Sequence, residues 1–551
     1  MKHCNLNFLC LFFFFLSSIA FGQDYYKTER QTWLSKANEL KPQLTEMIKH
    51  PLRLVHTVED KTSFQGWKAV DSAPMDSLYK NAFTKNRAVI IDFGEHLTGY
   101  FSFTLAPLMQ TPDAPVRFKL TFGEVPSEVS VPFDPYKGSL SRAWLQDEVV
   151  TAMDVPSTIT ITRRLAFRYV KIEMISQSVA FDFKITDMSC KSVTSASAFP
   201  EALSAGTEPM IKKIDQVGLK TLQECMQTVY EDGPKRDRRL WIGDLYLESL
   251  ANSYSFKNYN LTKRCLYLLA GLSDQNGYLI ATVFENPEPH PQTGTHLMDY
   301  SFLYNVALKE YFNVTNDIET VNSLWPVAKR QLDIIYAYLQ PNGLMNYDKA
   351  NKEWWLFFDW KEGLHKEAAL QGLTIYTLKQ TYELARIVNK QGEVKDLPLL
   401  IDKMTQAARK YLYDKNKNLF ESGPQKQISY ASQIWMILGD VLSTKESRKC
   451  LNEIIHMKGA FYPGSPYLYH YYIQALINSG MNEEARKTIQ NYWGGMVTRG
   501  ADTFWEVYDP NNEFLSPYNF YPINSYCHAW SCTPVYFIRK YPEIFQTDRK
   551  H

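Results

Sequence analysis

The feature that most constrains the fold is a change of hydrophobic periodicity within the 551-residue chain. Between residues 54 and 195, short runs alternate apolar and polar side chains with a period of two, as strands do. From Pro209 to the end, apolar residues recur at helical spacing instead. A chain of this length can bury more than one core. The switch therefore predicts two domains of different class.

The first of these regions predicts an antiparallel β-sandwich. Turn residues bound its β-rich runs, and the spacing of the runs is typical of sandwiches. The runs begin at Ala88, Gly99, Val116, Ser157, Phe167 and Phe181. Such modules bind sugar in some proteins and brace a catalytic domain in others. Since the sequence shows no aromatic trio suited to sugar binding, we expect a bracing role.

The second region predicts a toroid of helical hairpins. About twelve helical stretches are separated by short Gly, Pro and Asn breaks, as expected where neighbouring helices pack antiparallel. They begin near Pro209, Trp241, Asn260, Thr295, Asp317, His365, Val394, Ile428, Thr444, Ser465, Asn482 and His528. Twelve helices without strands predict six hairpins closed into an all-α (α/α)6 toroid. Longer loops at 281–294, 347–363 and 506–525 should surround its central cleft.

The N-terminus predicts export. Residues 1–23 resemble a secretory signal, with Lys2 and His3 before an apolar run and small residues after it. Residues 27–50 are charged and helix-compatible, and we expect an N-terminal helical arm over residues 24–53. The sandwich should then span 54–200 and the toroid 201–551. Because no other stretch approaches the length of a membrane span, we expect a soluble secreted or periplasmic protein that is not inserted in a membrane after signal removal.

Composition narrows the partners. A net charge of +1 gives no reason to expect nucleic acid, and the 14% aromatic content is compatible with carbohydrate clefts. The six cysteines after the signal are scattered without zinc-like spacing, so no metal or other cofactor is expected. Most should be buried free thiols, although Cys527 and Cys532 are close enough in sequence to form a disulfide.

Residues 231–244 form the first candidate site. Gly233-Pro234 predicts a turn, and a helix from Asp237 would place Asp237, Trp241, Asp244 and Glu248 along one face. Carboxylates around an indole suit a sugar site, where acids handle protons and hydroxyls and the ring stacks on the sugar. The alternative is a helix N-terminus with acids near its dipole and arginines paired to them. For the cluster as a whole we favour a site, which also includes Asp232, Arg236 and Arg238.

Residues 353–363 form the second candidate site. Trp354, Trp355 and Trp360 lie in this short stretch and cannot all be buried easily there. They form either a hydrophobic lid on the core or a stacking platform for sugar. Asp359, beside Trp360, could bind a sugar hydroxyl.

The third candidate site surrounds Glu506. This carboxylate lies between Trp505 and Tyr508, where partial desolvation should raise its pKa and make it a usable base. His528 lies further along the chain and could bind a hydroxyl or cap the last helix. Carboxylates from two remote segments are what glycoside hydrolysis needs. The chain lacks the HExxH, P-loop, Gly-x-Ser-x-Gly and dinucleotide-binding motifs of competing chemistries.

Residues 232–244 resemble the signature of the bacterial α-L-rhamnosidase family, Asp-x-Pro-x-Arg-Asp-Glu-Arg-x-x-Trp-x-Gly-Asp. Residues 92–99, 166–172 and 503–506 also resemble stretches of that family, and the resemblance extends from about residue 85 onward. It implies a β-sandwich followed by a six-hairpin toroid, and release of terminal α-L-rhamnose from glycans or glycosides with inversion.

Carried over by position, the resemblance makes Glu506 the general base and places Asp232, Asp237, Trp241 and Asp244 around the rhamnose, with His528 assisting. Many members carry a glutamate as general acid after the Arg-Asp pair, where this chain has Arg238. Arginine holds its proton too tightly to serve as an acid, so the role passes to Asp237 or Asp232. Repulsion among the three aspartates should raise one pKa, and the nearby arginines should lower it.

Two alternatives remain open. A toroid glycosidase for another deoxy-sugar or a uronate would use Arg238 to pair with a substrate carboxylate. A non-catalytic glycan-binding protein would keep the cleft without the chemistry, against which the presence of Glu506 argues. In either case the partner is an oligosaccharide or polysaccharide.

Overall fold

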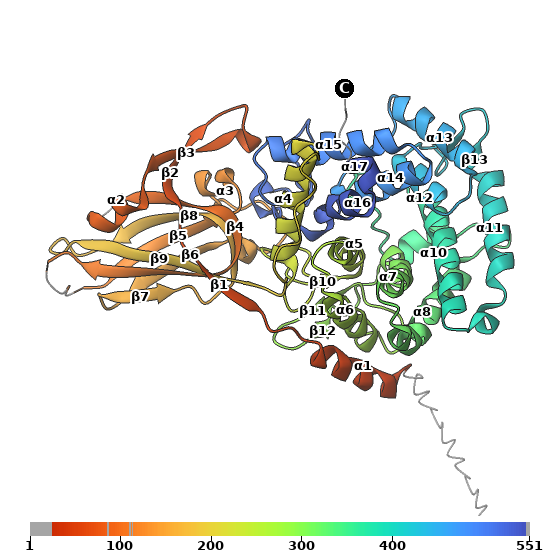
Figure 1. The fold of residues 1–551 in the computed structure, drawn as a ribbon, viewed down its shortest axis with the longest axis horizontal. Coiled ribbons are helices and arrows are strands. Elements are labelled where there is room, and N and C mark those ends of the chain that lie inside the picture. The colour runs from red at the N-terminus through yellow and green to blue at the C-terminus, as the bar shows by residue number, and fades with distance from the viewer. Residues whose placement is uncertain (1–24, 85–86, 110–111, 113, 547–551) are drawn as a thin grey trace, which may run out of the picture.

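A computed structural model describes residues 25–84, 87–109, 112 and 114–546 of the protein. A β-sandwich lies beside a ring of helices, as the periodicity predicts (Figure 1). The predicted signal at residues 1–23 lies outside the described residues. Among the helices that are described, none is long and apolar enough to cross a membrane.

The helical domain has two concentric layers. Its main helices are α4 (Pro209–Cys225), α5 (Ile242–Ser253), α6 (Tyr259–Gly271), α7 (Met298–Thr315), α8 (Ile318–Tyr338), α10 (Glu367–Ile387), α11 (Leu397–Tyr411), α12 (Tyr430–Leu438), α13 (Thr444–His456), α14 (Pro466–Asn478), α15 (Asn482–Thr498) and α16 (Pro534–Lys540). Inner helices α5, α7, α10, α12 and α14 pack in that order, and the short turn Ala529–Cys532 before α16 contacts both α14 and α5, which closes the ring. Each inner element follows an outer helix, so the predicted six-hairpin toroid is confirmed.

Most helices begin within about three residues of their predicted starts. The last helix was predicted to start near His528. A 3-10 turn follows His528 instead, and α16 starts at Pro534. The expected loop at 347–363 contains a short helix, α9 (Tyr347–Glu353), capped by the Asn346 side chain, which accepts a hydrogen bond from the Lys349 N–H. Short helix α17 (Pro542–Phe545) ends the described chain.

The sandwich consists of β1 (Thr45–Lys49), β2 (Arg53–Glu59), β3 (Trp67–Ala73), β4 (Ala88–Pro107), β5 (Val116–Gly123), β6 (Asp147–Ala152), β7 (Ser157–Thr160), β8 (Leu165–Ser176) and β9 (Phe183–Thr194), with short helices α2 (Met75–Lys80) and α3 (Pro126–Ser130). All the pairings are antiparallel. The predicted runs at 88 and 99 are two halves of the single long strand β4.

Strand β4 joins the two layers of the sandwich. Its first half pairs with β2 and β8, and its second half pairs with β7 and β9. The change of partner follows a register shift between Asp92 and Leu97, where Gly94 has a φ of +80° that favours glycine. Buried phenylalanines fill the space between the layers, among them Phe93, Phe101, Phe103, Phe118, Phe122 and Phe167.

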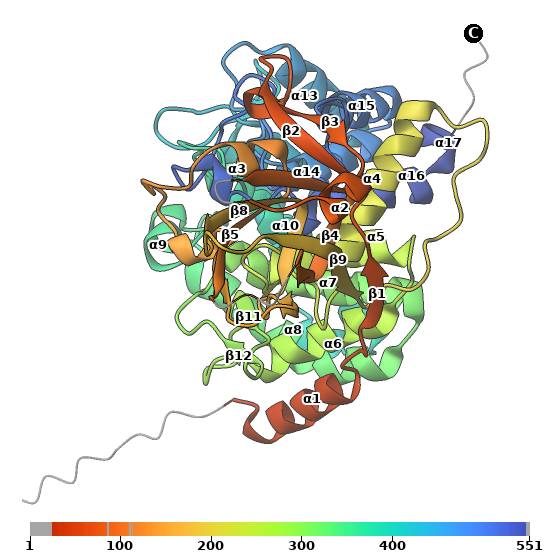
Figure 2. The same ribbon diagram turned by 90° about the vertical axis from the view of Figure 1, so that its left-hand side faces the viewer.

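The N-terminal arm packs against both domains. Helix α1 (Lys27–Glu39) packs on α6 and buries Trp33, whose indole N–H donates to Ser323 at 3.2 Å. The helix ends well before His50, where the helix-compatible stretch was expected to end. Pro42 disfavours helical backbone at the residue before it and lacks an N–H, and the chain continues as β1, which pairs with β9. Figure 2 shows β1 leading from α1 toward the sandwich.

The six described cysteines are free and buried, as predicted for most of them. The Cys527–Cys532 disulfide that the sequence left open is therefore not formed. Cys527 instead faces Cys225, with 4.0 Å between the two sulfurs.

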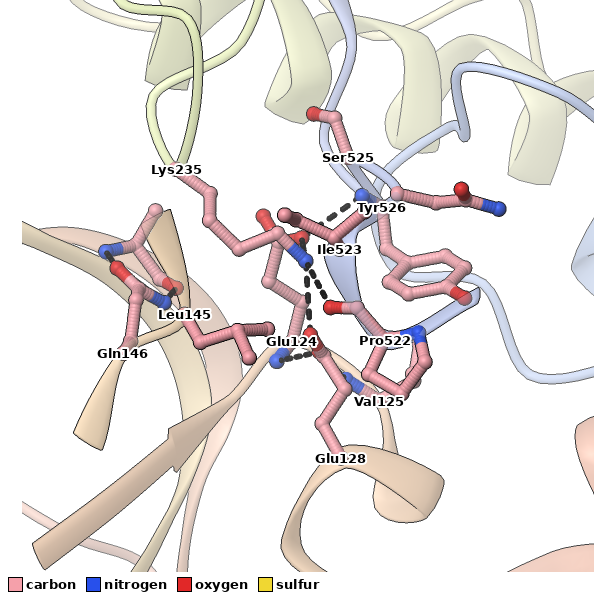
Figure 3. A network of polar contacts seen from close by, with 12 residues as sticks. Glu124, Val125, Glu128, Leu145, Gln146, Lys235, Pro522, Ile523, Ser525 and Tyr526 are labelled. Atoms are coloured by element: carbon pink, nitrogen blue, oxygen red, sulfur yellow. Dashed lines mark hydrogen bonds and ion pairs between the residues drawn. The ribbon is translucent and has the colours of Figure 1, made fainter. Parts of the chain in front are cut away.

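A buried ion cluster joins the two domains. Lys235 is 2% exposed, and its ammonium lies 2.9 Å from Glu124 and 2.7 Å from Glu128, both in the sandwich domain. Glu124 also accepts a hydrogen bond from the backbone N–H of Tyr526 at 2.7 Å. Figure 3 shows Lys235 and the 522–526 segment converging on the two glutamates. The loop that carries the first candidate site is therefore fixed to the sandwich.

Two of the β-domain segments that resemble the rhamnosidase family also lie at this boundary. Glu95 contacts Lys220 of α4 at 2.8 Å, and His96 lies 3.6 Å from Glu224 of the same helix. Arg168 bridges Asp92 of β4 to Asp502 of the helical domain, at 2.8 and 3.2 Å. These residues contact the neighbouring domain, so their structural role is to dock the sandwich.

Replacing Lys235 by methionine should destabilise the protein strongly. Glu124 and Glu128 would lose their buried cation, and breaking a buried pair in this way typically costs about 3–5 kcal/mol. Thermal unfolding followed by circular dichroism measures the effect. Lys80→Met is the matched control, because it removes an exposed ammonium that pairs with Asp76 at 2.9 Å. Equal melting temperatures for the two variants would contradict the assigned role of Lys235.

Candidate active site

The segments that precede helices α5, α7, α10 and α16 enclose a cavity of about 420 Å³. One residue of the sandwich domain, Leu140, completes its wall. Of the candidate residues predicted from sequence, nine line this cavity: Asp232, Arg236, Asp237, Trp241, Asp244, Trp355, Trp360, Glu506 and His528. All three sequence clusters therefore contribute to one site.

The first cluster is a closed loop rather than the start of a helix. The Asp232 carboxylate accepts hydrogen bonds from the backbone N–H groups of Asp237 at 3.1 Å and Arg239 at 3.2 Å. Arg238 has a φ of +62°, outside the helical region. The helix predicted from Asp237 therefore begins only at Ile242, after Trp241 has paired with β11 (Thr282–Phe284).

Glu506 is buried among hydrogen-bond donors. Its carboxylate contacts the guanidinium of Arg236, accepts from the hydroxyl of Tyr518, and accepts from the Ser525 N–H at 3.2 Å. Burial alone would raise the pKa of Glu506, but Arg236, with help from His528 and these donors, holds the pKa below its usual range. The sequence-based expectation of a raised pKa was wrong, because it considered the aromatic neighbours and not the arginine.

One guanidinium separates two carboxylates. Arg236 binds Glu506 through Nη2, and its Nη1 lies 3.7 Å from Asp237. Asp237 also pairs with Arg239 at 2.9 Å. Because the guanidinium lies between them, Glu506 and Asp237 face the same cavity without touching each other.

A second group of acids lies deeper. Burial, reinforced by the charge of Asp237, raises the pKa of Asp232 to about 7. Asp232 is therefore the aspartate whose pKa is raised by repulsion within the cluster, as the sequence predicted for one of the three. Burial also raises the pKa of Asp244, whose carboxylate lies 3.6 Å from the His528 ring. Glu248, on the same helix, is fully buried and its pKa is raised well above its usual value. This side of the cavity therefore favours protonated carboxyls.

Aromatic rings form much of the remaining wall. Trp241 packs edge-on against Trp355 and Tyr300, and Trp360 packs edge-on against Tyr518. Phe357 stacks on Trp530 with 5.7 Å between ring centres. Flat apolar faces beside carboxylates match the two sides of a sugar, whose C–H groups and hydroxyls face different directions.

Four candidate residues do not line this cavity. The Arg238 guanidinium donates to the Lys235 carbonyl at 3.2 Å, and burial lowers its pKa to about 9. Trp354 donates to the Tyr338 hydroxyl at 2.9 Å, and Trp505 stacks on Phe64 of the sandwich domain at 3.9 Å. The fourth, Asp359, has both carboxylate oxygens engaged by the 464–465 backbone and side chain.

Several lining residues were not among the candidates. Arg239 lies within the first cluster, so its proximity in sequence could have suggested it. Tyr518 lies in the loop expected at 506–525, and His296 lies just after the loop expected at 281–294. Nothing in the local sequence of either residue marks it as part of a site. Tyr300 reaches the cavity because Gly243 leaves room, since an added Cβ there would lie 2.4 Å from its ring.

No group of three or more potential metal ligands occurs among the residues that the structure describes. Carboxyl groups and the His528 imidazole are among the side chains that line the cavity.

Comparison with known proteins agrees with this architecture. Residues 51–192 match the glycosyl hydrolase family 78 alpha-rhamnosidase N-terminal domain. Residues 204–541 match the bacterial alpha-L-rhamnosidase six-hairpin glycosidase domain. Among curated proteins, no significant match was found.

Solved structures give the same result. A rhamnosidase from Klebsiella oxytoca with rhamnose bound is 39% identical, with a TM-score of 0.90 over 93% of this chain and 99% of that chain. The family 78 rhamnosidase of Bacillus sp. GL1 is 19% identical, with a TM-score of 0.69 over 86% of this chain and 49% of that chain, and shows the fold alone. With its sandwich, its toroid and both domain matches, this chain belongs to glycoside hydrolase family 78, the α-L-rhamnosidases.

Proposed function

We propose that the protein is exported and releases terminal α-L-rhamnose from glycans or glycosides, with inversion at the anomeric carbon. The observation that carries this proposal is the placement of Arg236 between Glu506 and Asp237 in one cavity. Inverting glycosidases need about 6.5–9.5 Å between their two carboxyl groups to admit a water molecule, whereas retaining enzymes need only about 5–5.5 Å. A guanidinium between the carboxylates favours the wider spacing.

Glu506 acts as the general base in this proposal. Its lowered pKa keeps it ionised near neutral pH, so it can take a proton from a water molecule that attacks the anomeric carbon. Asp237 donates a proton to the glycosidic oxygen as that bond breaks. Asp232 is less suited to the acid role, because both of its oxygens already accept backbone N–H groups.

The remaining polar groups bind the sugar. Asp244 and His528 lie together on one wall, and one oxygen of Asp244 and both ring nitrogens of His528 have no hydrogen-bond partner in the described structure. Unpaired buried polar groups are costly unless a ligand or water satisfies them. Sugar hydroxyls, which both donate and accept, are suitable partners for this pair.

The alternatives are less well supported. A uronate substrate was suggested by Arg238, but that guanidinium does not line the cavity. A purely glycan-binding role leaves the ionised Glu506, held by Arg236 in the same cavity as Asp237, without a purpose. Export depends on the signal-like residues 1–23, and secretion of the full-length chain by a bacterial host, with cleavage near residue 23, would test it.

Replacing either proposed catalytic carboxyl should abolish most activity. We expect Glu506→Gln to lower kcat by on the order of 10²–10⁴ on every rhamnoside, because no other group would activate the water. Asp237→Asn should cause a similar loss with a sugar leaving group, but a much smaller loss with a 4-nitrophenolate, which departs without protonation.

Asp232→Asn is the control for the assignment of the acid. It should reduce activity equally with both leaving groups, because its proposed role is to hold the loop. If the dependence on the leaving group appeared in Asp232→Asn and not in Asp237→Asn, the acid role would pass to Asp232. Inversion is checked by following the anomer first released by NMR.

The pH dependence should report the contact between Arg236 and Glu506. The base acts only when deprotonated, so activity falls as the pH drops through its pKa. Arg236→Met removes the charge that lowers this pKa and should move the acidic limb of the kcat/KM profile to higher pH. Tyr518→Phe removes one hydrogen bond and should give a smaller shift in the same direction. Unchanged acidic limbs in both variants would show that Glu506 is not the group that titrates.

A further inference from the structure

A second cavity adjoins the proposed active site. It has a volume of about 980 Å³, more than twice that of the cavity containing Glu506. Trp355, Phe357 and Trp360 line both cavities and so form the wall between them. Trp355 is 46% exposed, which leaves its indole accessible. A molecule held in the first cavity can therefore continue over this wall into the second.

Hydrogen bonds fix the wall of the second cavity. Asp359 is almost fully buried, and its two oxygens accept hydrogen bonds from the Gly464 N–H and the Ser465 hydroxyl, each at 2.5 Å. These contacts tie the tryptophan-rich loop to the start of α14. Deeper in the cavity, the Tyr492 hydroxyl donates to the Tyr508 carbonyl at 2.9 Å. A surface fixed in this way loses little entropy when a ligand binds.

Aromatic side chains supply the contact surface. Tyr462 is 46% exposed, and Tyr469 stacks on Tyr492 with 3.8 Å between ring centres. All three line the second cavity. Tyrosine offers an apolar face and a polar hydroxyl together, a combination that suits the C–H face and the hydroxyl edge of a sugar ring.

The charges of the second cavity do not select an acidic ligand. Lys361 and Lys366 line it, but so do Glu362 and Asp509. The Lys366 ammonium already donates to the Leu356 carbonyl at 2.5 Å, and burial lowers its pKa. No excess of free positive charge remains among these lining residues to pair with a carboxylate.

We propose that the second cavity binds the leaving saccharide, an uncharged oligosaccharide of at least two sugar residues from which the rhamnose is removed. This inference rests on the proposed function for the identity of the first sugar. The first cavity accommodates one sugar, and the larger volume, aromatic lining and balanced charge of the second fit a longer neutral chain. The enzyme should then discriminate among rhamnosides by the saccharide to which the rhamnose is attached.

The test compares leaving groups in Tyr462 variants. The substrates are 4-nitrophenyl α-L-rhamnoside and α-L-rhamnosyl derivatives of cellobiose, lactose and maltose. Tyr462→Ala should raise KM for the best rhamnosyl disaccharide about 3- to 10-fold, the loss expected for one aromatic contact. KM for the nitrophenyl substrate and both kcat values should stay near wild type. Tyr462→Phe, which keeps the ring, should restore the wild-type KM.

Tyr336→Ala is the matched control, because this tyrosine is 41% exposed but lines neither cavity. The inference is overturned if Tyr462→Ala affects both substrate types equally, or affects none of the rhamnosyl disaccharides. A Tyr462-dependent preference for rhamnosyl digalacturonate would overturn the assignment of an uncharged ligand.

Failure of the proposed function would give a different result. If the wild type released no rhamnose from any substrate, calorimetry with free cellobiose, lactose and maltose would still test the cavity. Binding to the wild type that is weakened in Tyr462→Ala but not in Tyr336→Ala supports the second cavity as a saccharide site. Absence of binding to the wild type rejects it.

Discussion

Two consecutive buried cations connect the scaffold of this protein to its chemistry. Lys235 pairs with Glu124 and Glu128 of the sandwich, and Arg236 pairs with Glu506 across the cavity. A buried charge that loses its partner is strongly destabilising. Both contacts therefore fix the backbone at Lys235 and Arg236. The position of the proposed base relative to the loop that carries Asp237 thus depends on the docking of a domain whose described residues contribute only Leu140 to the cavity. This gives the bracing role expected for the sandwich a physical basis.

The same arrangement separates the protonation states of acids that share one cavity. Burial favours the neutral form of any carboxyl, and it raises the pKa of Asp232 and Asp244. Glu506 is equally buried, yet Arg236 keeps its pKa low. A carboxylate that stays ionised although it is buried is what a general base requires. The arginine therefore determines which carboxyl is suited to accept a proton.

The sequence predicted the fold well, because hydrophobic periodicity is a local property that burial preserves. It missed β1, β2, β3 and β6, which are short or lie toward the edges of the sheet and alternate weakly. Within the site, it identified Asp237 and Glu506 from their unusual neighbours. It could not identify Tyr518, whose role arises only when the chain folds back on Glu506. It also misjudged Trp505 and Asp359, because an aromatic or acidic residue looks the same in sequence whether it faces a cavity or supports its wall.

The structure also accounts for the arginine at position 238, which follows the Arg-Asp pair where the family signature has a glutamate. The family signature has two residues between its last arginine and the tryptophan, whereas this chain has only Leu240 between Arg239 and Trp241. Counted back from the tryptophan, Asp237 therefore occupies the position of the glutamate. The tryptophan is the better reference point, because Trp241 is fixed by its pairing with β11 and by the start of α5. Arg238 then belongs to the turn, with its side chain directed to Lys235. A loop shorter by one residue keeps a carboxyl in the cavity, and the shorter aspartate side chain remains beside Arg239 and Arg236.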